Sequence, residues 1–312
     1  MWGAQMASER RSTEPRPALS AERAVTVINL LVAHPNERFP LSEIGRRTNI
    51  NPASLHALLA VLTRSGFVTR HPTSRTYGIG PALIPIGEVA RQQSPVIQRA
   101  IEYADDFSRT RGFEMAVSVH TESSIIIIDT VGDASPFGPS LHPGQVVPLV
   151  PPLGTIFLAW ESDERVERWL NSAQPALRPE EREHQMALLE SVRKRGYGVG
   201  LESPARRALG EVFRDRTDRG TAVELLTDLA HSPYMLRSME TGRRYDVAGI
   251  YAPVFNDSSR VEVAITVVGL PSGLAAEEIS EIADEVRGAA TVITKQTGGR
   301  TPTALNGGRD VA

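Results

Sequence analysis

The sequence predicts an α+β protein with a small, mostly helical N-terminal domain and a larger C-terminal domain of mixed helices and strands. Its 312 residues, 41% of them hydrophobic, suffice for two cores. Helical periodicity dominates before Gly66, whereas strand and helix patterns alternate after Glu114. Charge divides similarly: from Arg16 to Gly80 eight arginines and three glutamates give a net +5, and the residues from Pro81 onward carry 24 basic and 32 acidic groups, a net −8.

Composition excludes several functional classes. The chain has no cysteine, so disulfides, thiolate nucleophiles and cysteine-ligated metals are impossible. No apolar run approaches the ~20 residues that span a bilayer, and residues 1–17 read as a disordered leader without a signal peptide's apolar core. P-loop, zinc-peptidase and serine-hydrolase motifs are absent. We therefore expect a cytoplasmic protein that is not an enzyme and has no catalytic residues, cofactor or metal.

The basic segment contains three helix signals. Ser20 is the expected N-cap of a first helix that ends before Pro35, and Leu41–Arg47 predicts a short second helix. Asn51 as N-cap and Pro52 at the first position begin a third helix, which Gly66 terminates. One stripe of this helix is leucine-rich, with Leu55, Leu58, Leu59 and Leu62. The opposite stripe is small and polar, with Ala53, Ser54, His56, Ala57, Ala60 and Arg64.

Two extended runs, Phe67–Arg70 and Thr76–Ile79, follow as a hairpin with Arg75 near its tip. Three helices, a tight turn and a basic hairpin form the plan of a winged helix-turn-helix. The small face of its third helix is free to enter a major groove ~12 Å wide. Double-stranded DNA is the expected partner. The alternative is a ligand-dependent adaptor that uses the winged helix for protein contacts.

Several segments of the basic half follow a known family pattern: Ala24–Leu31, Leu41–Ile44, Leu55–Leu59, Leu62, Gly66–Val68 and Tyr77–Gly80. The same pattern continues through Gly144–Leu149, Gly154–Ala159, Ile250–Phe255 and Ala264–Gly269. Together these segments span most of residues 20–297 and give the chain a resemblance to the IclR family of bacterial transcriptional regulators. It implies a DNA-binding domain (18–80), a linker helix (81–94) and a GAF-like α/β effector-binding domain (95–297), followed by a disordered tail (298–312). It also implies an operator, a small-molecule effector, and a homodimer or homotetramer that acts as a repressor or an activator.

The recognition helix departs from the family pattern. The family often has Ser-Thr-hydrophobic-x-Arg-Leu-Leu where this chain has Ala53–Leu59, so Ala57 replaces the arginine. Either the operator differs, or phosphate contacts shift to arginines elsewhere in the domain. The expected DNA-binding residues are Arg46, Arg47, Asn51, Ala53, Ser54, His56, Ala57, Arg64, Arg70 and Arg75.

The expected effector site also departs from the family. By resemblance, small carboxylates meet backbone N–H groups just before Gly154 and small polar residues on the last strands. Here Pro152 has no N–H, and Val268 replaces a frequent hydroxyl. We therefore expect a partly apolar effector. The expected contacts are Pro152, Leu153, Gly154, Thr155, Gly249, Tyr251, Thr266 and Val268.

The remaining patterns predict a predominantly antiparallel sheet. Its expected strands are Glu114–His120, a deeply buried Ser124–Val131, Tyr197–Leu201, Val247–Phe255 and Arg260–Gly269. Helices are expected near Leu153 and over Pro179–Arg195 and Ala275–Thr297, and the linker helix is interrupted by Pro85. The segment at about 203–245, helix-like over Thr221–Leu229, reads as an insertion relative to the family. It covers the pocket, extends an oligomer interface or decorates the surface.

Overall fold

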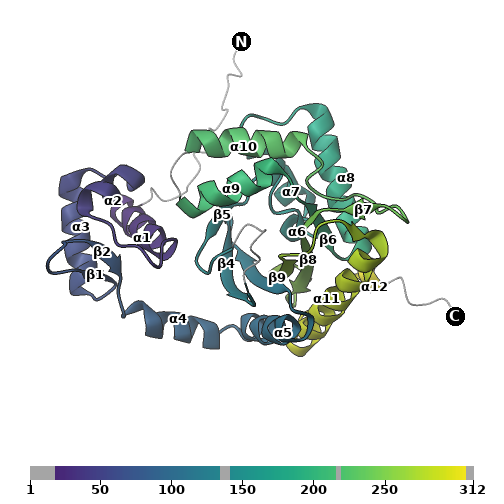
Figure 1. Ribbon diagram of the computed structural model, residues 1–312, viewed down its shortest axis with the longest axis horizontal. Coiled ribbons are helices and arrows are strands. Elements are labelled where there is room, and N and C mark those ends of the chain that lie inside the picture. The colour runs from purple at the N-terminus through teal and green to yellow at the C-terminus, as the bar shows by residue number, and fades with distance from the viewer. Residues whose placement is uncertain (1–17, 134–140, 216–218, 307–312) are drawn as a thin grey trace, which may run out of the picture.

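The computed structural model describes residues 18–133, 141–215 and 219–306. The predicted leader, residues 1–17, lies outside the described residues. Figure 1 shows a small N-terminal body and a larger C-terminal body, joined along the chain by a helix that spans the space between them. None of the described helices is long and apolar enough to cross a membrane.

The N-terminal body is the predicted winged helix-turn-helix. Helices α1 (Leu19–Val32), α2 (Leu41–Thr48) and α3 (Pro52–Arg64) precede an antiparallel pair, β1 (Val68–Arg70) and β2 (Tyr77–Ile79). The N–H of Phe39 donates to the carbonyl of Tyr77 at 3.0 Å, and the N–H of Tyr77 donates back at 2.8 Å, which adds a third short segment to the wing. The expected N-cap was wrong: Ala18 occupies that position, and Ser20 lies in the first turn of α1.

Every element of this body contributes to one core. The predicted leucine stripe faces inward, although Leu58 is only half-buried. Because α3 is held by this stripe alone, its other face is free of the core. The buried members are Val27, Leu30, Leu31, Phe39, Ile44, Ile50, Leu55, Leu59, Leu62, Val68 and Tyr77.

The linker helix α4 (Leu83–Gln92) has no buried residue. Its apolar side chains Ile84, Ile86 and Val89 are 73%, 51% and 52% exposed. The expected interruption at Pro85 was wrong. Pro85 is the third residue of α4, within the first turn, where a backbone N–H has no partner inside the helix, so a proline removes no hydrogen bond there.

The C-terminal body is built on a six-stranded antiparallel sheet of order β5-β4-β3-β9-β8-β6. In that order the strands are β5 (Val146–Pro148), β4 (Ser124–Val131), β3 (Glu114–His120), β9 (Val261–Val268), β8 (Val247–Phe255) and β6 (Gly198–Leu201). A separate pair joins β7 (Arg244–Tyr245) to β10 (Leu274–Ala275). The predicted strands are therefore present, in antiparallel pairing.

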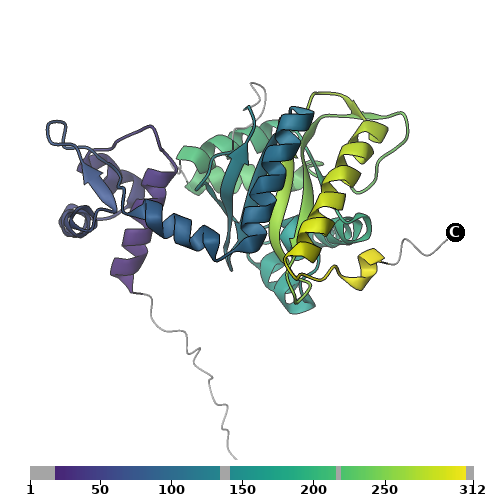
Figure 2. The same cartoon turned by 90° about the horizontal axis from the view of Figure 1, so that it is seen from below.

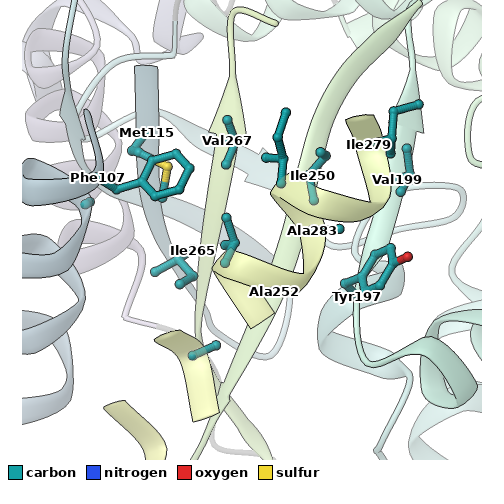
Figure 3. Packing of buried hydrophobic residues seen from close by; sticks show 14 of the residues in the cluster. Phe107, Met115, Tyr197, Val199, Ile250, Ala252, Ile265, Val267, Ile279 and Ala283 are labelled. Carbon is teal, nitrogen blue, oxygen red and sulfur yellow. The ribbon is translucent and has the colours of Figure 1, made fainter. Parts of the chain in front are cut away.

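One face of the sheet is covered by α5 (Pro95–Arg111) and α11 (Ala276–Gln296), which lie side by side in Figure 2. Figure 3 shows Ile279 and Ala283 of α11 and Phe107 of α5 packing on sheet residues such as Ile250 and Val267. The six residues of α11 that were predicted to point inward are all buried: Ile279, Ile282, Ala283, Val286, Ala290 and Ile293.

The other face is covered by α6 (Thr155–Leu158), α7 (Asp163–Asn171), α8 (Pro179–Arg195), α9 (Pro204–Asp215) and α10 (Arg219–His231). Their apolar residues form a second core with Phe255, Val261 and Ala264 of the sheet. A last helix, α12 (Thr303–Asn306), packs Leu305 onto this core. The predicted disordered tail is thus wrong for residues 298–306, because this segment is held by an apolar contact; residues 307–312 lie outside the described residues.

The expected deep burial of the isoleucine run in β4 was also wrong. Ile127 is buried, whereas Ile125, Ile126 and Ile128 are only half-buried. β4 is next to the edge of the sheet, with only the short β5 beyond it. Strands near an edge have fewer covering neighbours, so an apolar run does not establish a central position.

Candidate functional site

The outward face of α3 is the first candidate site. Oδ1 of Asn51 accepts a hydrogen bond from the N–H of Ser54 at 2.9 Å, so the predicted N-cap is confirmed. Ala53, His56 and Ala57 are exposed, and Ser54 is half-buried. The face is small enough for close approach to a groove and carries two polar side chains, Ser54 and His56, near the start of the helix.

Four of the predicted arginines are exposed around this face. Arg64 ends α3, and Arg70 and Arg75 belong to the wing. The guanidinium of Arg70 lies 5.8 Å from the ring centroid of Tyr77. Arg46 on α2 is 65% exposed and pairs with Glu43 at 2.6 Å. These four cations come from α2, from the end of α3 and from the wing, which are the elements before and after α3 in the chain.

Arg47 has different surroundings. Its side chain is only 15% exposed, and its Nε donates to Oε1 of Glu43 at 2.7 Å. Its guanidinium lies 4.8 Å from the centroid of Phe39 and 3.3 Å from Nε2 of His34. Hydrogen bonds from Arg46 and Arg47 lower the pKa of Glu43 to about 2. Arg47 therefore holds α2 against the end of α1, which suits a structural role better than a phosphate contact.

Arg38 is a wing residue that the sequence interpretation missed. Its Nη2 donates to the carbonyl of Thr69 in β1 at 3.0 Å and to that of Thr76, just before β2, at 3.4 Å, so it ties the wing to the segment before α2. A Cβ on Gly78 would lie 2.9 Å from Nη1 of Arg38, so glycine makes room for this side chain. No local pattern connects Arg38 to strands more than thirty residues later.

The second candidate site is a cavity of about 180 Å³ on the face of the sheet that α6 to α10 cover. Its walls are contributed by β3, β4, β5, β8 and β9, by the segment at α6, and by α9 and α10. The lining is mostly apolar. It comprises Ala116, Ser118, Ile125, Ile127, Leu141, Gln145, Val147, Pro152, Leu153, Gly154, Thr155, Ile156, Phe157, Arg206, Leu209, Gly210, Phe213, Leu229, Tyr234, Met235, Ala248, Tyr251, Thr266 and Val268.

The structure brings the expected effector contacts together with one exception. Pro152, Leu153, Gly154, Thr155, Tyr251, Thr266 and Val268 all line the cavity. Gly249 does not line it. A Cβ at Gly249 would lie 3.2 Å from the hydroxyl of Tyr251, so this glycine supports the site by leaving space for the tyrosine.

The segment predicted as an insertion supplies part of the wall. Arg206, Leu209, Gly210 and Phe213 come from α9, and Leu229 comes from α10. Figure 1 shows these two helices lying together beside the sheet. This placement favours the first of the three roles left open by the sequence, that of covering the pocket.

Arg206 forms the most polar part of the lining. Its Nη1 donates to the hydroxyl of Tyr251 at 2.9 Å, and its Nη2 donates to the carbonyl of Tyr234 at 3.4 Å. The hydroxyl of Tyr234 donates to Oε1 of Gln185 at 2.7 Å. Burial raises the pKa of Tyr234, so its phenol stays neutral. The sequence interpretation did not single out Arg206, because its partners lie 28 and 45 residues away.

One loop joins the cavity to the winged helix-turn-helix. Leu141 and Gln145 line the cavity, and Gly144 between them contacts α1: a Cβ on Gly144 would lie 2.0 Å from Cγ1 of Val32. Backbone bonds fix the loop to β4, since the N–H of Gly144 donates to the carbonyl of Ile127 at 2.8 Å. Movement of either lining residue would displace the backbone against which Val32 packs.

In the described ranges, no group of three or more His, Asp or Glu side chains is placed to hold a metal ion. The polar groups in the largely apolar lining of the cavity are hydroxyls, the amide of Gln145 and the guanidinium of Arg206. That set can hold a small organic molecule and orient one polar end of it.

Known proteins resemble the chain in sequence. Residues 20–72 match the model of the IclR helix-turn-helix domain. The glycerol operon regulatory protein of Streptomyces coelicolor is 26% identical over 189 residues, which cover 59% of this chain and 73% of that protein. The HTH-type transcriptional regulator XynR of Escherichia coli is 20% identical over 280 residues, 89% of this chain and 97% of its own length.

Solved structures share the fold. An IclR transcriptional regulator from Alicyclobacillus acidocaldarius has a TM-score of 0.67 at 21% identity, covering 91% of this chain and all of its own. An IclR homologue from Microbacterium hydrocarbonoxydans, solved with 4-hydroxybenzoate, has a TM-score of 0.59 at 16% identity, over 89% of this chain and 99% of its own. Residues 20–72 are thus identified as an IclR helix-turn-helix domain, and the chain shares the fold of solved IclR regulators over about 90% of its length, 91% for the first of them.

Proposed function

We propose that this regulator binds its operator through α3 and the wing, and that a small, partly apolar ligand in the cavity controls operator affinity. The DNA-binding residues are Ser54 and His56 for bases, with Arg46, Arg64, Arg70 and Arg75 for phosphates. The observation that carries the ligand control is the loop at Gly144, which contacts both the cavity and α1. The curated relatives named above are regulators, which supports a non-enzymatic role.

Operator binding is tested first with the full chain. Selection from random DNA should yield a preferred sequence, and gel retardation of that sequence should weaken steeply with salt, because phosphate contacts release counterions. An adaptor that uses its winged helix for protein contacts would give no sequence-dependent retardation. That result would contradict the proposal.

Ligand chemistry is tested by calorimetry. Glyoxylate and pyruvate should bind weakly, because each is too small to fill a largely apolar cavity, and because Pro152 offers no N–H and Val268 offers only hydrocarbon. Tight binding of either acid that is unaffected by Thr266→Val would disprove this description of the pocket.

Control of operator affinity is tested through Val32→Ala. A panel of small aromatic and aliphatic acids and their amides is screened for compounds that raise the melting temperature of the full chain. The best compound should change operator affinity in the unchanged protein, and less so in Val32→Ala, although both should bind it equally. The control is Val292→Ala, an exposed valine on α11. An undiminished response in Val32→Ala would exclude this loop as the link.

A further inference from the structure

The wing contains a set of contacts that the function proposed so far does not use. Arg38 lies in the segment before α2, and its Nη2 donates to the carbonyl of Thr69 at 3.0 Å and to the carbonyl of Thr76 at 3.4 Å. The same nitrogen also donates to Oγ1 of Thr69 at 3.1 Å. One guanidinium thus connects both sides of the hairpin to a third segment of the chain. We call these contacts of Arg38 with Thr69 and Thr76 the Arg38 brace.

The two carbonyls of the brace belong to residues beside the wing arginines. Thr69 immediately precedes Arg70, and Thr76 immediately follows Arg75. Arg75 has a φ of 55°, a left-handed conformation that residues with a side chain seldom adopt and that persists only where the surrounding structure fixes it. The direction of both arginine side chains therefore depends on backbone that Arg38 holds.

Gly78 of β2 provides the space for the brace. A Cβ at this position would lie 2.9 Å from Nη1, 3.2 Å from Cζ and 3.5 Å from Cγ of Arg38, so the arginine side chain lies across the glycine. The φ of Gly78 is not positive, so its backbone conformation does not itself require glycine. A larger residue would displace the guanidinium from the carbonyls.

The positive charges of the wing have no acidic partners within the protein. Arg38, Arg70 and Arg75 are exposed, and among the described residues none of the three forms a salt bridge with a carboxylate. Like charges held in one short hairpin repel one another, and the phosphates of a DNA backbone relieve that repulsion. The hairpin is therefore suited to a polyanion.

We propose that Arg38 is a positioning residue for DNA binding, which holds the wing in the direction in which Arg70 and Arg75 reach the phosphates of the operator. Arg38 acts through the backbone of Thr69 and Thr76, and the wing arginines make the contacts. A wing that is ordered before DNA arrives loses less conformational entropy on binding. This inference rests on the proposed function and specifies how the wing takes part in it.

The first test removes the brace from the full chain. Arg38→Met keeps a long side chain but removes its donors and its charge. Affinity for the selected operator should fall roughly 10-fold, because contacts to charged groups are lost. The slope of log affinity against log salt should fall by about one to two units, since each phosphate contact contributes about 0.9. Circular dichroism and the melting temperature without DNA show that the variant is folded.

A double-variant comparison separates positioning from direct contact. Arg75→Ala should reduce the salt slope by about one unit in the unchanged protein. In the Arg38→Met background it should reduce the slope by clearly less, because a wing that is not held no longer presents Arg75 to the phosphate. If Arg38 itself contacted a phosphate, the two losses would add.

Gly78→Ala tests the brace without removing a charge. The added Cβ displaces the guanidinium, so operator affinity and salt slope should fall as they do in Arg38→Met. In the Arg38→Met background the same change should have little further effect, because no guanidinium is left to displace. Arg99→Met removes an exposed arginine of α5, so it controls for loss of charge and should alter neither affinity nor slope.

Hydrogen exchange measures the wing in the absence of DNA. Backbone amides of residues 67–80 should exchange faster in Arg38→Met and in Gly78→Ala than in the unchanged protein, because local opening of the hairpin costs less free energy without the brace. Amides of the sheet in the C-terminal body should exchange at the same rate in all three proteins.

The inference is overturned if Arg38→Met keeps the affinity and slope of the unchanged protein, if its loss and that of Arg75→Ala add, or if Gly78→Ala binds DNA normally. Unchanged exchange in the wing would overturn it as well. Failure of the proposed function gives a different result. The unchanged protein would then show no sequence-dependent retardation, whereas retardation that does not depend on Arg38 refutes this inference alone.

Discussion

At the scale of single residues, Gly80 leaves less room for a side chain than the other glycines of the wing, Gly66 and Gly78. A Cβ there would lie 2.1 Å from the carbonyl oxygen of Gly66, so backbone must move to admit any side chain. Gly80→Ala should destabilise the protein by about 1–3 kcal/mol. Gly288→Ala, in α11 with nothing within 4 Å of the added atom, should instead stabilise it by about 0.5–1 kcal/mol. Thermal unfolding midpoints that shift in the same direction for both variants would contradict this account.

Ser54 and His56 should differ from Arg75 in what they contribute to DNA binding. A bulky acidic residue at Ser54 or His56 should abolish discrimination between operator and random DNA, at roughly 1–3 kcal/mol per lost base contact. Arg75→Ala should weaken binding to all sequences alike and reduce the slope of log affinity against log salt by about one unit. Retardation titrations at several salt concentrations separate the two effects. Full discrimination in both α3 variants would show that α3 is not the recognition helix.

Residues with local partners could be predicted, and residues with distant partners could not. The cap at Asn51 and the leucine stripe of α3 are fixed by neighbours within a few positions, so sequence spacing identifies them. Arg206 depends on Tyr251, 45 positions later, and Arg38 depends on Thr69, 31 positions later. No periodic pattern encodes such pairs, and both arginines were missed for this reason.

At the scale of elements, Glu181 joins α8 to α10. Its carboxylate accepts from the backbone N–H of Arg178 at 2.7 Å, and lies 2.6 Å from Nε2 of His231. The hydrogen bonds from Arg178 and then His231 lower its pKa from 4.5 to about 2. A carboxyl with a lowered pKa stabilises the fold above its unfolded value and loses that contribution as pH falls.

Glu181→Gln should therefore lower the melting temperature at pH 7, by the equivalent of about 1–2 kcal/mol. The difference from the unchanged protein should shrink below pH 4.5 and vanish only below about pH 2, where the native carboxyl becomes protonated as well. Glu190→Gln, at an exposed position of the same helix, is the control and should have little effect at any pH. A difference that persists unchanged into acid would mean that the charge of Glu181 is not what joins the helices.

The elements that the sequence predicted are those with an unbroken pattern. α11 has inward residues at helical spacing over its whole length, and β8 and β9 have long apolar runs between polar turns. α5 and α9 were not predicted as helices. α5 buries Val96, Ala100, Ala104 and Phe107 at helical spacing, so its pattern was present in the sequence and was overlooked. α9 buries few side chains and shows no such stripe. Because α9 was not predicted, the part of the cavity wall that it supplies was missed as well.

At the scale of the whole molecule, the exposed apolar side chains of the linker indicate an oligomer. Ile84, Ile86 and Val89 of α4, and Leu19 and Val25 of α1, are all at least half exposed. Figure 1 shows that α4 spans the space between the two bodies, and no residue of α4 is buried. One recognition helix reads only a few base pairs, and a two-fold symmetric dimer doubles the contact with a palindromic site. We therefore expect at least a dimer, formed through α1 and α4, with the C-terminal domains available for a tetramer.

Ile84→Glu combined with Val89→Glu should dissociate this dimer. Burying each apolar side chain is worth about 1.5–3 kcal/mol, and a buried unpaired carboxylate adds a further cost. Light scattering at micromolar concentration should give at least twice the chain mass for the unchanged protein and the mass of one chain for the double variant. Because the two DNA-binding domains then act independently, operator affinity should fall. The slope of log affinity against log salt should approach half its value in the unchanged protein. Val292→Glu, an exposed change on α11, should alter neither mass nor slope. A monomer mass for the unchanged protein, with or without DNA, would refute the dimer and with it the reading of a palindromic operator.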